Sequence, residues 1–284
     1  MKIVFMGTPD FAVESLNALV QAGHEVAAVI TQPEKVKDDS FLELLRSYAP
    51  EVLVVVAYGR ILPQAVLDLP QYGCINVHGS LLPAYRGAAP IQRAVFDGCA
   101  ETGVTIMQMD IGMDTGDILM QGSLPITAED NSGTMFDKLA ALGGQLLVQT
   151  LEQLQQGKIV PQKQDEAAAT YAAKILKEDE LIDWTLPAQT LFYRIRALAP
   201  APGAYTFWNG QRLKIWKVNP VSRESGKEPG TIAEVGKESL LVQTGEGCLE
   251  VLELQPAGKK SMPAKAFCNG TGVKPGLRFG EIDA

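Results

Sequence analysis

The sequence has few histidines and cysteines, and this scarcity limits the metal and disulfide chemistry open to it. The two histidines, His24 and His78, are far apart, and the four cysteines include no Cys-x-x-Cys pair. Zinc sites and disulfide frameworks are recognised by close, regular spacing of such residues. We therefore expect a protein without a metal ion and with reduced thiols.

Long apolar runs and nucleotide-binding motifs are also missing. No stretch approaches the roughly 18 consecutive apolar residues of a membrane helix, and the first residues lack the pattern of a secretory signal. Gly7, after the first predicted strand, does not continue into G-x-G-x-x-G, and no phosphate loop with G-K-[ST] occurs. These absences favour a cytoplasmic protein with no membrane partner and no nucleotide cofactor.

An excess of positive charge is absent as well. The formal net charge of −8 argues against a protein that coats nucleic acid nonspecifically. The charge is uneven, because residues 1–174 hold 11 basic and 20 acidic side chains, whereas residues 175–284 hold 14 and 13. The difference reflects either two parts with different partners or an incidental shift.

The residues that are present indicate an ordinary globular protein, 46% apolar and 20% charged over 284 residues. Near-continuous β-branched runs at 26–31 and 52–58 alternate with helical patterns. This alternation is typical of a parallel sheet buried on both faces. Over residues 1–154 we predict an α/β, Rossmann-like domain, with a mostly parallel sheet and helices on both faces.

The pattern changes after the polar segment 155–174, which we interpret as a linker. A helical pattern at 190–197 precedes short strand patterns at 204–208, 212–218, 230–235, 239–244 and 248–255. Asn209-Gly210 between two of these strands is a strong hairpin signal. We predict that residues 175–284 form a smaller β-barrel domain, with an OB-like barrel as the favoured architecture.

The stretch from Gly73 to Pro90 contains the strongest candidate for chemistry. It begins as a strand and ends in a loop rich in glycine and proline, with Asn76 and His78 two residues apart. Side chains i and i+2 of an extended chain point to the same face, so the amide and the imidazole emerge together. Asp114 follows another predicted strand, and ligands of doubly wound sheets bind at such strand ends.

Asn76, His78 and Asp114 together suit direct acyl transfer. A carboxylate orients an imidazole and makes it more basic, and an amide can donate a hydrogen bond to a developing oxyanion. The substrate amine would itself be the nucleophile. The alternative is that these side chains only satisfy loop backbone or face solvent, and spacing alone does not decide between the two.

Two long motifs carry a family resemblance. One runs G-C-I-N-V-H-G-S-L-L-P-x-x-R-G-A-A-P-I-Q from Gly73, and the other runs E-T-G-V-T-I-M-Q-M-D-x-G-x-D-T-G-D from Glu101. Shorter matches are G-T-P-D-F, V-V-V-A-Y-G, I-D-W and L-Q-P-A-G-K-K. Over nearly the whole chain the sequence resembles the folate-dependent formyltransferase family, and the C-terminal motifs resemble its methionyl-tRNA formyltransferase branch.

The resemblance implies transfer of a formyl group from 10-formyltetrahydrofolate to the α-amino group of methionine on initiator tRNA, for translation initiation. Asn76 and His78 would stabilise the formyl oxygen as it becomes an oxyanion, His78 would also move a proton, and Asp114 would orient His78. The C-terminal domain would bind tRNA, and we expect a monomer. The segment that matches the family's folate-binding residues comprises Ser80, Leu81, Leu82 and Pro83.

Several basic and aromatic side chains of the C-terminal domain are candidates for phosphate contacts and base stacking. The alternative is that they form a solvated face and a barrel core. They are Arg194, Arg196, Arg212, Lys214, Lys217, Lys259, Lys260, Trp208 and Trp216. Two rival functions stay open: another 10-formyltetrahydrofolate-dependent formyltransferase or hydrolase acting on a small amine or water, and a noncatalytic RNA-binding protein.

The segment from Thr31 to Glu51 departs from the family pattern because it is short. The family normally carries here a long loop rich in glycine, lysine, arginine and proline, which is expected to help recognise the tRNA acceptor end. Either the natural chain lacks this loop, or the sequence in hand omits part of it, and we favour the second explanation. An intact mass close to 30.6 kDa would contradict it.

Overall fold

The computed structural model describes residues 1–31 and 38–280 and divides the chain into two compact units. The N-terminal unit comprises Met1–Ala94, Ala100–Ile126 and Thr134–Lys174, and the C-terminal unit comprises Val95–Cys99, Thr127–Gly133 and Ile175–Ala284. Residues 32–37 of the short 31–51 segment lie outside the described residues. That part of a longer loop is omitted here therefore stays a prediction. No helix among the described residues is long and apolar enough to cross a membrane.

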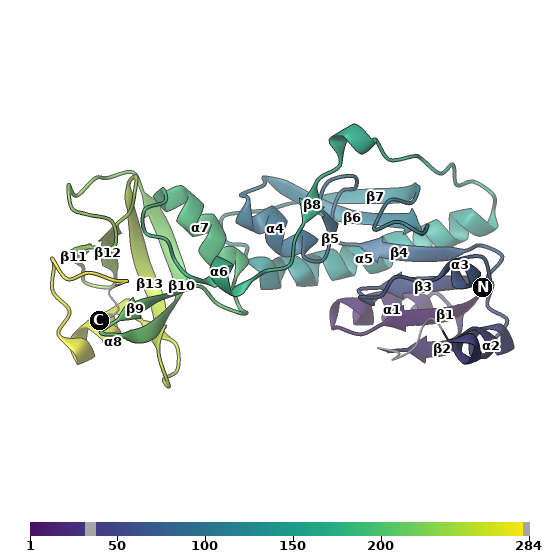
Figure 1. The fold of residues 1–284 in the computed structure, drawn as a ribbon, viewed down its shortest axis with the longest axis horizontal. Coiled ribbons are helices and arrows are strands. Elements are labelled where there is room, and N and C mark those ends of the chain that lie inside the picture. Colours follow the sequence, from purple (N-terminus) through teal and green to yellow (C-terminus); the bar gives the residue numbers. More distant parts are fainter. Residues whose placement is uncertain (32–37, 281–284) are drawn as a thin grey trace. The chain divides into compact units, whose positions relative to one another are not determined.

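A six-stranded sheet forms the centre of the N-terminal unit, with the strand order β2-β1-β3-β4-β6-β7 (Figure 1). The first four strands in this order are parallel, whereas β6 is antiparallel to both of its neighbours. This arrangement confirms the predicted α/β class with a mostly parallel sheet. The strands are β1 (Lys2–Gly7), β2 (Glu25–Ile30), β3 (Val52–Val56), β4 (Cys74–His78), β6 (Glu101–Gln108) and β7 (Ile118–Pro125).

Helices cover both faces of this sheet, which explains why β3 has the uniformly apolar sequence V-L-V-V-V. On one face, α2 (Asp39–Ser47) and α3 (Gln64–Leu67) contribute apolar side chains to a buried cluster that includes Cys74 of β4. On the other face, α5 (Ser132–Gln155) packs against β4 at Gly143 and against α1 (Phe11–Gln21) at Gly144. Helix α5 approaches β4 so closely at Gly143 that a Cβ there would lie 2.9 Å from Val77 Cγ1.

Short elements surround the end of β4. The strand β5 (Arg86–Gly87) pairs in parallel with β8 (Tyr171–Ala172). The helix α4 (Pro90–Phe96) follows β5, and the 3-10 turn η1 (Glu166–Ala168) precedes β8. The β5–β8 pair therefore attaches the polar segment 155–174, interpreted from the sequence as a linker, to the loop that follows β4.

The C-terminal unit is built on a curled antiparallel sheet with the strand order β11-β12-β13-β10-β9, and β14 pairs with β13. Its five longer strands lie within a few residues of the predicted ranges. They are β9 (Tyr205–Trp208), β10 (Gln211–Val221), β11 (Ile232–Val235), β12 (Leu240–Gln243) and β13 (Cys248–Pro256), with β14 (Met262–Pro263) at the side. The helices of this unit are α6 (Lys177–Glu180), α7 (Ala188–Ala197) and α8 (Ala264–Thr271).

The turn between β9 and β10 confirms the predicted hairpin. Trp208 pairs with Gln211, and Asn209 and Gly210 between them have φ angles of 48° and 69°. Such a two-residue turn needs left-handed backbone at both positions, which asparagine and glycine tolerate best. The OB-like part of the prediction is not shown, because the pairs among the described strands form an open path from β11 to β9.

Candidate functional site

The structure places Asn76 and His78 near the C-terminal end of β4, on the same face of the central sheet. In the register with β6, Asn76 lies opposite Met107 and His78 lies opposite Thr105. His78 is 6% exposed and Asn76 is half-buried. The end of the strand therefore carries an amide and an imidazole side by side, as the spacing predicts.

Two loops hold the imidazole of His78. Its Nε2 atom lies 3.0 Å from the carbonyl oxygen of Tyr85. Because a carbonyl oxygen has no proton to donate, Nε2 is the donor of this hydrogen bond. Its Nδ1 atom lies 3.7 Å from Oδ1 of Asp114, a separation at which a proton on Nδ1 would make an ion pair. Catalytic contacts of this length often tighten when substrate binds. The structure thus brings His78 and Asp114 together.

Asp114 is fixed by its backbone as well as by its carboxylate. Its φ of 56° lies in the left-handed region, which aspartate tolerates better than most residues with a Cβ. Its Oδ2 atom accepts a hydrogen bond of 2.8 Å from the backbone N–H of Gly87. Its carbonyl oxygen accepts one of 2.8 Å from Nε2 of Gln164.

The segment from Ser80 to Pro83 is held by hydrogen bonds between its backbone and the side chains of Thr105 and Gln121. The Oγ1 atom of Thr105 donates to the Ser80 carbonyl at 2.7 Å and accepts from the Leu82 N–H at 3.0 Å. The Gln121 amide donates to the Leu82 carbonyl at 2.9 Å. Ser80 and Leu82 are buried, so Leu81 and Pro83 are the two side chains of this segment with surface to offer a ligand.

A buried arginine lies directly beside these groups. Arg86 is fully buried, and its guanidinium contacts Gln164 and Glu166 of the segment before β8. The hydrogen bond with Glu166 raises the pKa of Arg86 and lowers the pKa of Glu166. Paired in this way, the positive charge of Arg86 is tolerated away from water.

Arg86, Gln164 and Glu166 could not be recognised from sequence patterns. Arg86 stood inside the R-G-A-A-P part of a motif, but a single arginine in a loop usually faces solvent. Gln164 and Glu166 occur in a polar stretch without periodicity. Their partner is 78 and 80 residues away, and no local pattern reports such a contact.

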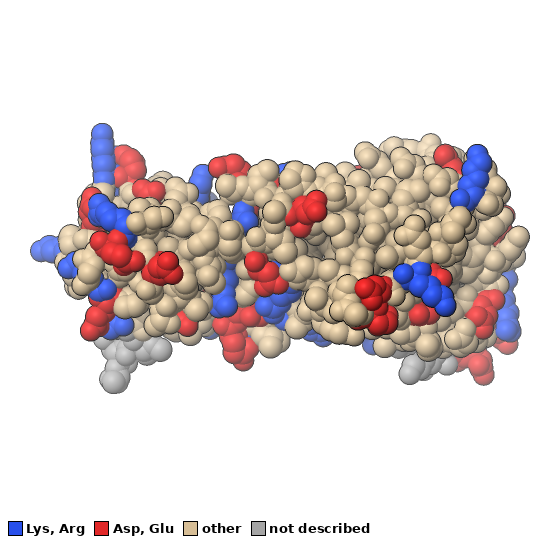
Figure 2. All heavy atoms as spheres, turned by 90° about the horizontal axis from the view of Figure 1, so that it is seen from above, with Lys and Arg blue, Asp and Glu red and all other residues tan. Residues whose placement is uncertain are grey.

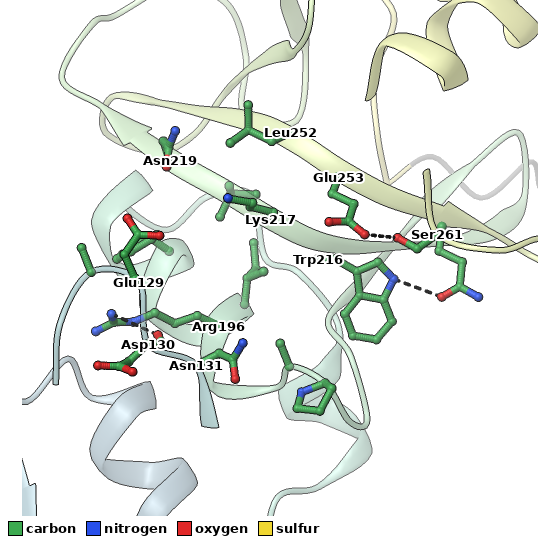
Figure 3. A pocket seen from close by; sticks show the side chains of 17 residues that line it. Glu129, Asp130, Asn131, Arg196, Trp216, Lys217, Asn219, Leu252, Glu253 and Ser261 are labelled. Atoms are coloured by element: carbon green, nitrogen blue, oxygen red, sulfur yellow. Dashed lines mark hydrogen bonds between the residues drawn. The ribbon is translucent and has the colours of Figure 1, made fainter. Parts of the chain in front are cut away.

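A hollow lies within the C-terminal unit. This cavity of about 630 Å³ is lined by the loop before α5, by α7 and by the strands β10 and β13. Figure 3 shows Glu129 and Asp130 beside Arg196 at one end of the cavity and Trp216 at the other. Its lining carries charges of both signs, and none of the predicted catalytic residues contributes to it.

Arg196, predicted as a phosphate contact, is used inside the C-terminal unit. It is 8% exposed and donates a hydrogen bond of 2.7 Å to the carbonyl of Thr127. Its Cζ atom lies 4.8 Å from the ring centroid of Phe192 and 5.1 Å from that of Tyr193. Burial lowers the pKa of this guanidinium. These contacts favour a structural role for Arg196.

Other predicted tRNA contacts divide between core and surface. Trp208 packs edge-to-face on Phe267 and Phe279, so it belongs to the core. Lys214 donates to the Pro202 carbonyl, whereas Lys260 is exposed. On the face drawn in Figure 2, acidic and basic side chains of the C-terminal unit are intermingled.

Two models of known protein families match this sequence. The family model described as formyl transferase matches residues 32–151, and the one described as formyl transferase, C-terminal domain, matches residues 174–272. Together the two matches span most of the chain.

Solved structures of low sequence identity share the fold. HypX from Aquifex aeolicus in complex with tetrahydrofolic acid is 18% identical, with a TM-score of 0.72 over 99% of this chain and 50% of that one. An N-formyltransferase from Helicobacter canadensis, in complex with folinic acid and dTDP-3-aminofucose, is 18% identical, with a TM-score of 0.67 over 90% and 99%. The methionyl-tRNA formyltransferase from Clostridium thermocellum is 21% identical, with a TM-score of 0.59 over 80% and 95%. The chain spans about half the length of the HypX structures that it matches.

Proposed function

Because the chain belongs to the formyl transferase family, we propose that it transfers the formyl group of 10-formyltetrahydrofolate to an amine. The observation that carries this proposal is the position of His78 at the end of β4, between the Tyr85 carbonyl and the Asp114 carboxylate. Asn76 on the same strand face completes the set. The presence of tetrahydrofolate or folinic acid in the structures of two proteins with this fold supports a folate as the formyl donor.

The proposed chemistry needs an oxyanion stabiliser and a proton carrier. The amine nitrogen attacks the formyl carbon, a new C–N bond forms, and the bond from that carbon to the folate nitrogen breaks. The side-chain amide of Asn76 donates a hydrogen bond to the formyl oxygen while it carries negative charge. His78 takes the proton lost by the amine and returns it to the departing folate nitrogen, and Asp114 keeps the imidazole oriented.

Of the four residues in the segment Ser80–Pro83, fewer can contact a folate than the sequence resemblance implied. Ser80 and Leu82 are buried, and the Ser80 carbonyl and both backbone groups of Leu82 bond to Thr105 and Gln121. We therefore assign the apolar contact with the flat heterocycle to Leu81 and Pro83. Ser80 and Leu82 would keep the shape of the segment.

For the acceptor, we propose the α-amino group of methionyl initiator tRNA. The I-D-W and L-Q-P-A-G-K-K motifs, which resemble those of the tRNA-specific branch, support this choice. On this reading residues 1–154 are catalytic and residues 175–284 bind tRNA. An amino sugar attached to a nucleotide is the second candidate, because an N-formyltransferase solved with such a compound shares the fold.

The test is a comparison of acceptors. The protein is incubated with 10-formyltetrahydrofolate and, separately, with methionyl initiator tRNA, with a dTDP-amino sugar or with no acceptor. We expect formyl-methionine from the first mixture and little tetrahydrofolate from the other two. Formylation of the sugar alone would replace the proposed acceptor, and tetrahydrofolate release without an acceptor would indicate a hydrolase.

A further inference from the structure

Three consecutive residues in the loop after β4 connect the whole site. The carbonyl of Tyr85 accepts the hydrogen bond from His78, and the N–H of Gly87 donates to the Asp114 carboxylate. Arg86 between them points its side chain into the protein and is fully buried. A shift of Arg86 would therefore move the partners of both His78 and Asp114.

The side chain of Gln164 joins this loop to the loop that carries Asp114. Its Oε1 atom accepts hydrogen bonds from Nε and Nη2 of Arg86, at 3.0 and 2.8 Å. Its Nε2 atom donates to the carbonyls of Asp114 and Gly116, at 2.8 and 2.7 Å. Because the guanidinium can only donate and the carbonyls can only accept, the orientation of the amide is fixed.

Glu166 makes a contact of a different kind. Its carboxylate accepts from Nη1 and Nη2 of Arg86, at 2.9 and 2.7 Å, and its side chain is largely exposed. Within the described residues, none of its hydrogen bonds reaches the loop that carries Asp114. Of Gln164 and Glu166, Gln164 is the one that bridges to that loop.

We propose that Gln164 is a positioning residue, which holds the left-handed backbone of Asp114 at the distance from His78 that catalysis requires. The proposal rests on the proposed function for its kinetic consequence. It assigns a role to the segment 155–174 beyond that of a linker, because the acidic partner of His78 is placed from this segment.

Gln164→Glu separates this role from simple support of Arg86. The new carboxylate keeps acceptor atoms for the guanidinium, but it loses both donors and sets negative charge against the Asp114 and Gly116 carbonyls. Gln162→Glu is the matched control, since Gln162 is exposed and lies two residues earlier in the same segment. We expect kcat of Gln164→Glu to fall by roughly ten- to a hundredfold, with KM for both substrates within about twofold of wild type.

A spectroscopic readout makes the test independent of the acceptor. The chain has only two histidines, so NMR of protein labelled at histidine gives one ring signal for His78 and one for His24. We expect Gln164→Glu to move the His78 signal and leave that of His24 unchanged, whereas Gln162→Glu moves neither. If wild type formylates no acceptor, the proposed function fails, and these signals alone decide the positioning role.

Two results would overturn the proposal. One is a Gln164→Glu protein with wild-type kcat and an unchanged His78 signal. The other is an equal loss in Gln162→Glu. Thermal unfolding is measured in parallel. If Gln164→Glu does not fold, Gln164→Met takes its place; it loses the donors to the Asp114 loop and also the acceptor for Arg86. Glu166→Gln then controls for weakened support of Arg86, and we expect Gln164→Met to lower kcat and move the His78 signal more than Glu166→Gln does.

Discussion

At the scale of single residues, the site depends on a few polar groups that are each held by more than one segment. His78 contacts the loops on both sides of it, and Asp114 is bonded through its side chain and through its backbone. In the proposed reaction, such double attachment keeps the reacting groups in place before substrate arrives, which is a large part of how enzymes lower barriers. Arg86 takes no part in the proposed chemistry. Its buried side chain instead fixes the loop whose residues Tyr85 and Gly87 contact His78 and Asp114.

The ion pair between Arg86 and Glu166 predicts a pH dependence of stability. The hydrogen bond from Arg86 lowers the pKa of Glu166 below its ordinary value of 4.5, so the contribution of the pair is complete at neutral pH. It is lost as pH falls below about 4.5 and through the lowered pKa of the folded state.

The measurement is urea unfolding of wild type and Glu166→Gln between pH 7 and pH 3. We expect wild type to be the more stable protein at pH 7, with the difference shrinking toward acid. Glu178→Gln, an exposed glutamate of the C-terminal unit, is the control for loss of one carboxylate. A difference between wild type and Glu166→Gln that grows as pH falls would contradict this assignment.

At the scale of elements, the sheet positions the site and the helices fix the sheet. Helix α5 can approach β4 because Gly143 has no side chain, and β4 carries Asn76 and His78. A Cβ at Gly143 would also meet Val104 of β6 at 3.6 Å. The close packing of this helix is therefore part of what defines the position of the site.

Gly143→Ala should destabilise the protein although alanine favours helices. We expect a loss of about 1–3 kcal/mol, because the added methyl lies too close to the Val77 side chain. Gly270→Ala in α8 is the matched control, since its Cβ would meet nothing within 4 Å, and it should gain about 0.5–1 kcal/mol. Chemical denaturation measures both, and equal effects of the two substitutions would refute the packing argument.

Elements differ in how far the sequence predicts them. The apolar run of β3 and the Asn209-Gly210 turn have local signals, because burial on two faces and left-handed turns each demand particular residues. The two-residue strands β5 and β8 have no such signal. Their pairing accompanies the contacts of the buried Arg86 with Gln164 and Glu166, which are distant in sequence. The sequence therefore predicted Asn76, His78 and Asp114 as candidates, but it did not predict the groups that hold them.

At the scale of the whole molecule, the two units raise different expectations. The N-terminal unit holds the proposed catalytic residues, and the C-terminal unit holds the candidates for tRNA contacts. Several of these candidates already make contacts within the C-terminal unit, including Arg196 with the Thr127 carbonyl and Trp208 with Phe267. Lys217, Lys259, Lys260 and Arg212 are exposed and remain suited to phosphate, and Arg212 also lies over the ring of Tyr205.

Lys260→Glu tests this division. If the C-terminal unit binds tRNA, the substitution should raise KM for methionyl initiator tRNA by roughly three- to tenfold and weaken its salt dependence, because one phosphate contact is lost. KM for 10-formyltetrahydrofolate should stay unchanged. Lys158→Glu, an exposed lysine of the N-terminal unit, makes the same charge change and should leave both KM values near wild type. Equal effects of both substitutions would indicate a general effect of net charge.

The central claim is that the histidine at the end of β4 carries out formyl transfer. The most direct test follows labelled formyl from 10-formyltetrahydrofolate to methionyl initiator tRNA with wild type, His78→Ala and His24→Ala, while folate binding is measured separately. We predict transfer by wild type and His24→Ala, and a loss in His78→Ala on the order of 10²–10⁴-fold in kcat with folate binding retained. Near-normal turnover by His78→Ala, or no transfer by wild type, would contradict the account.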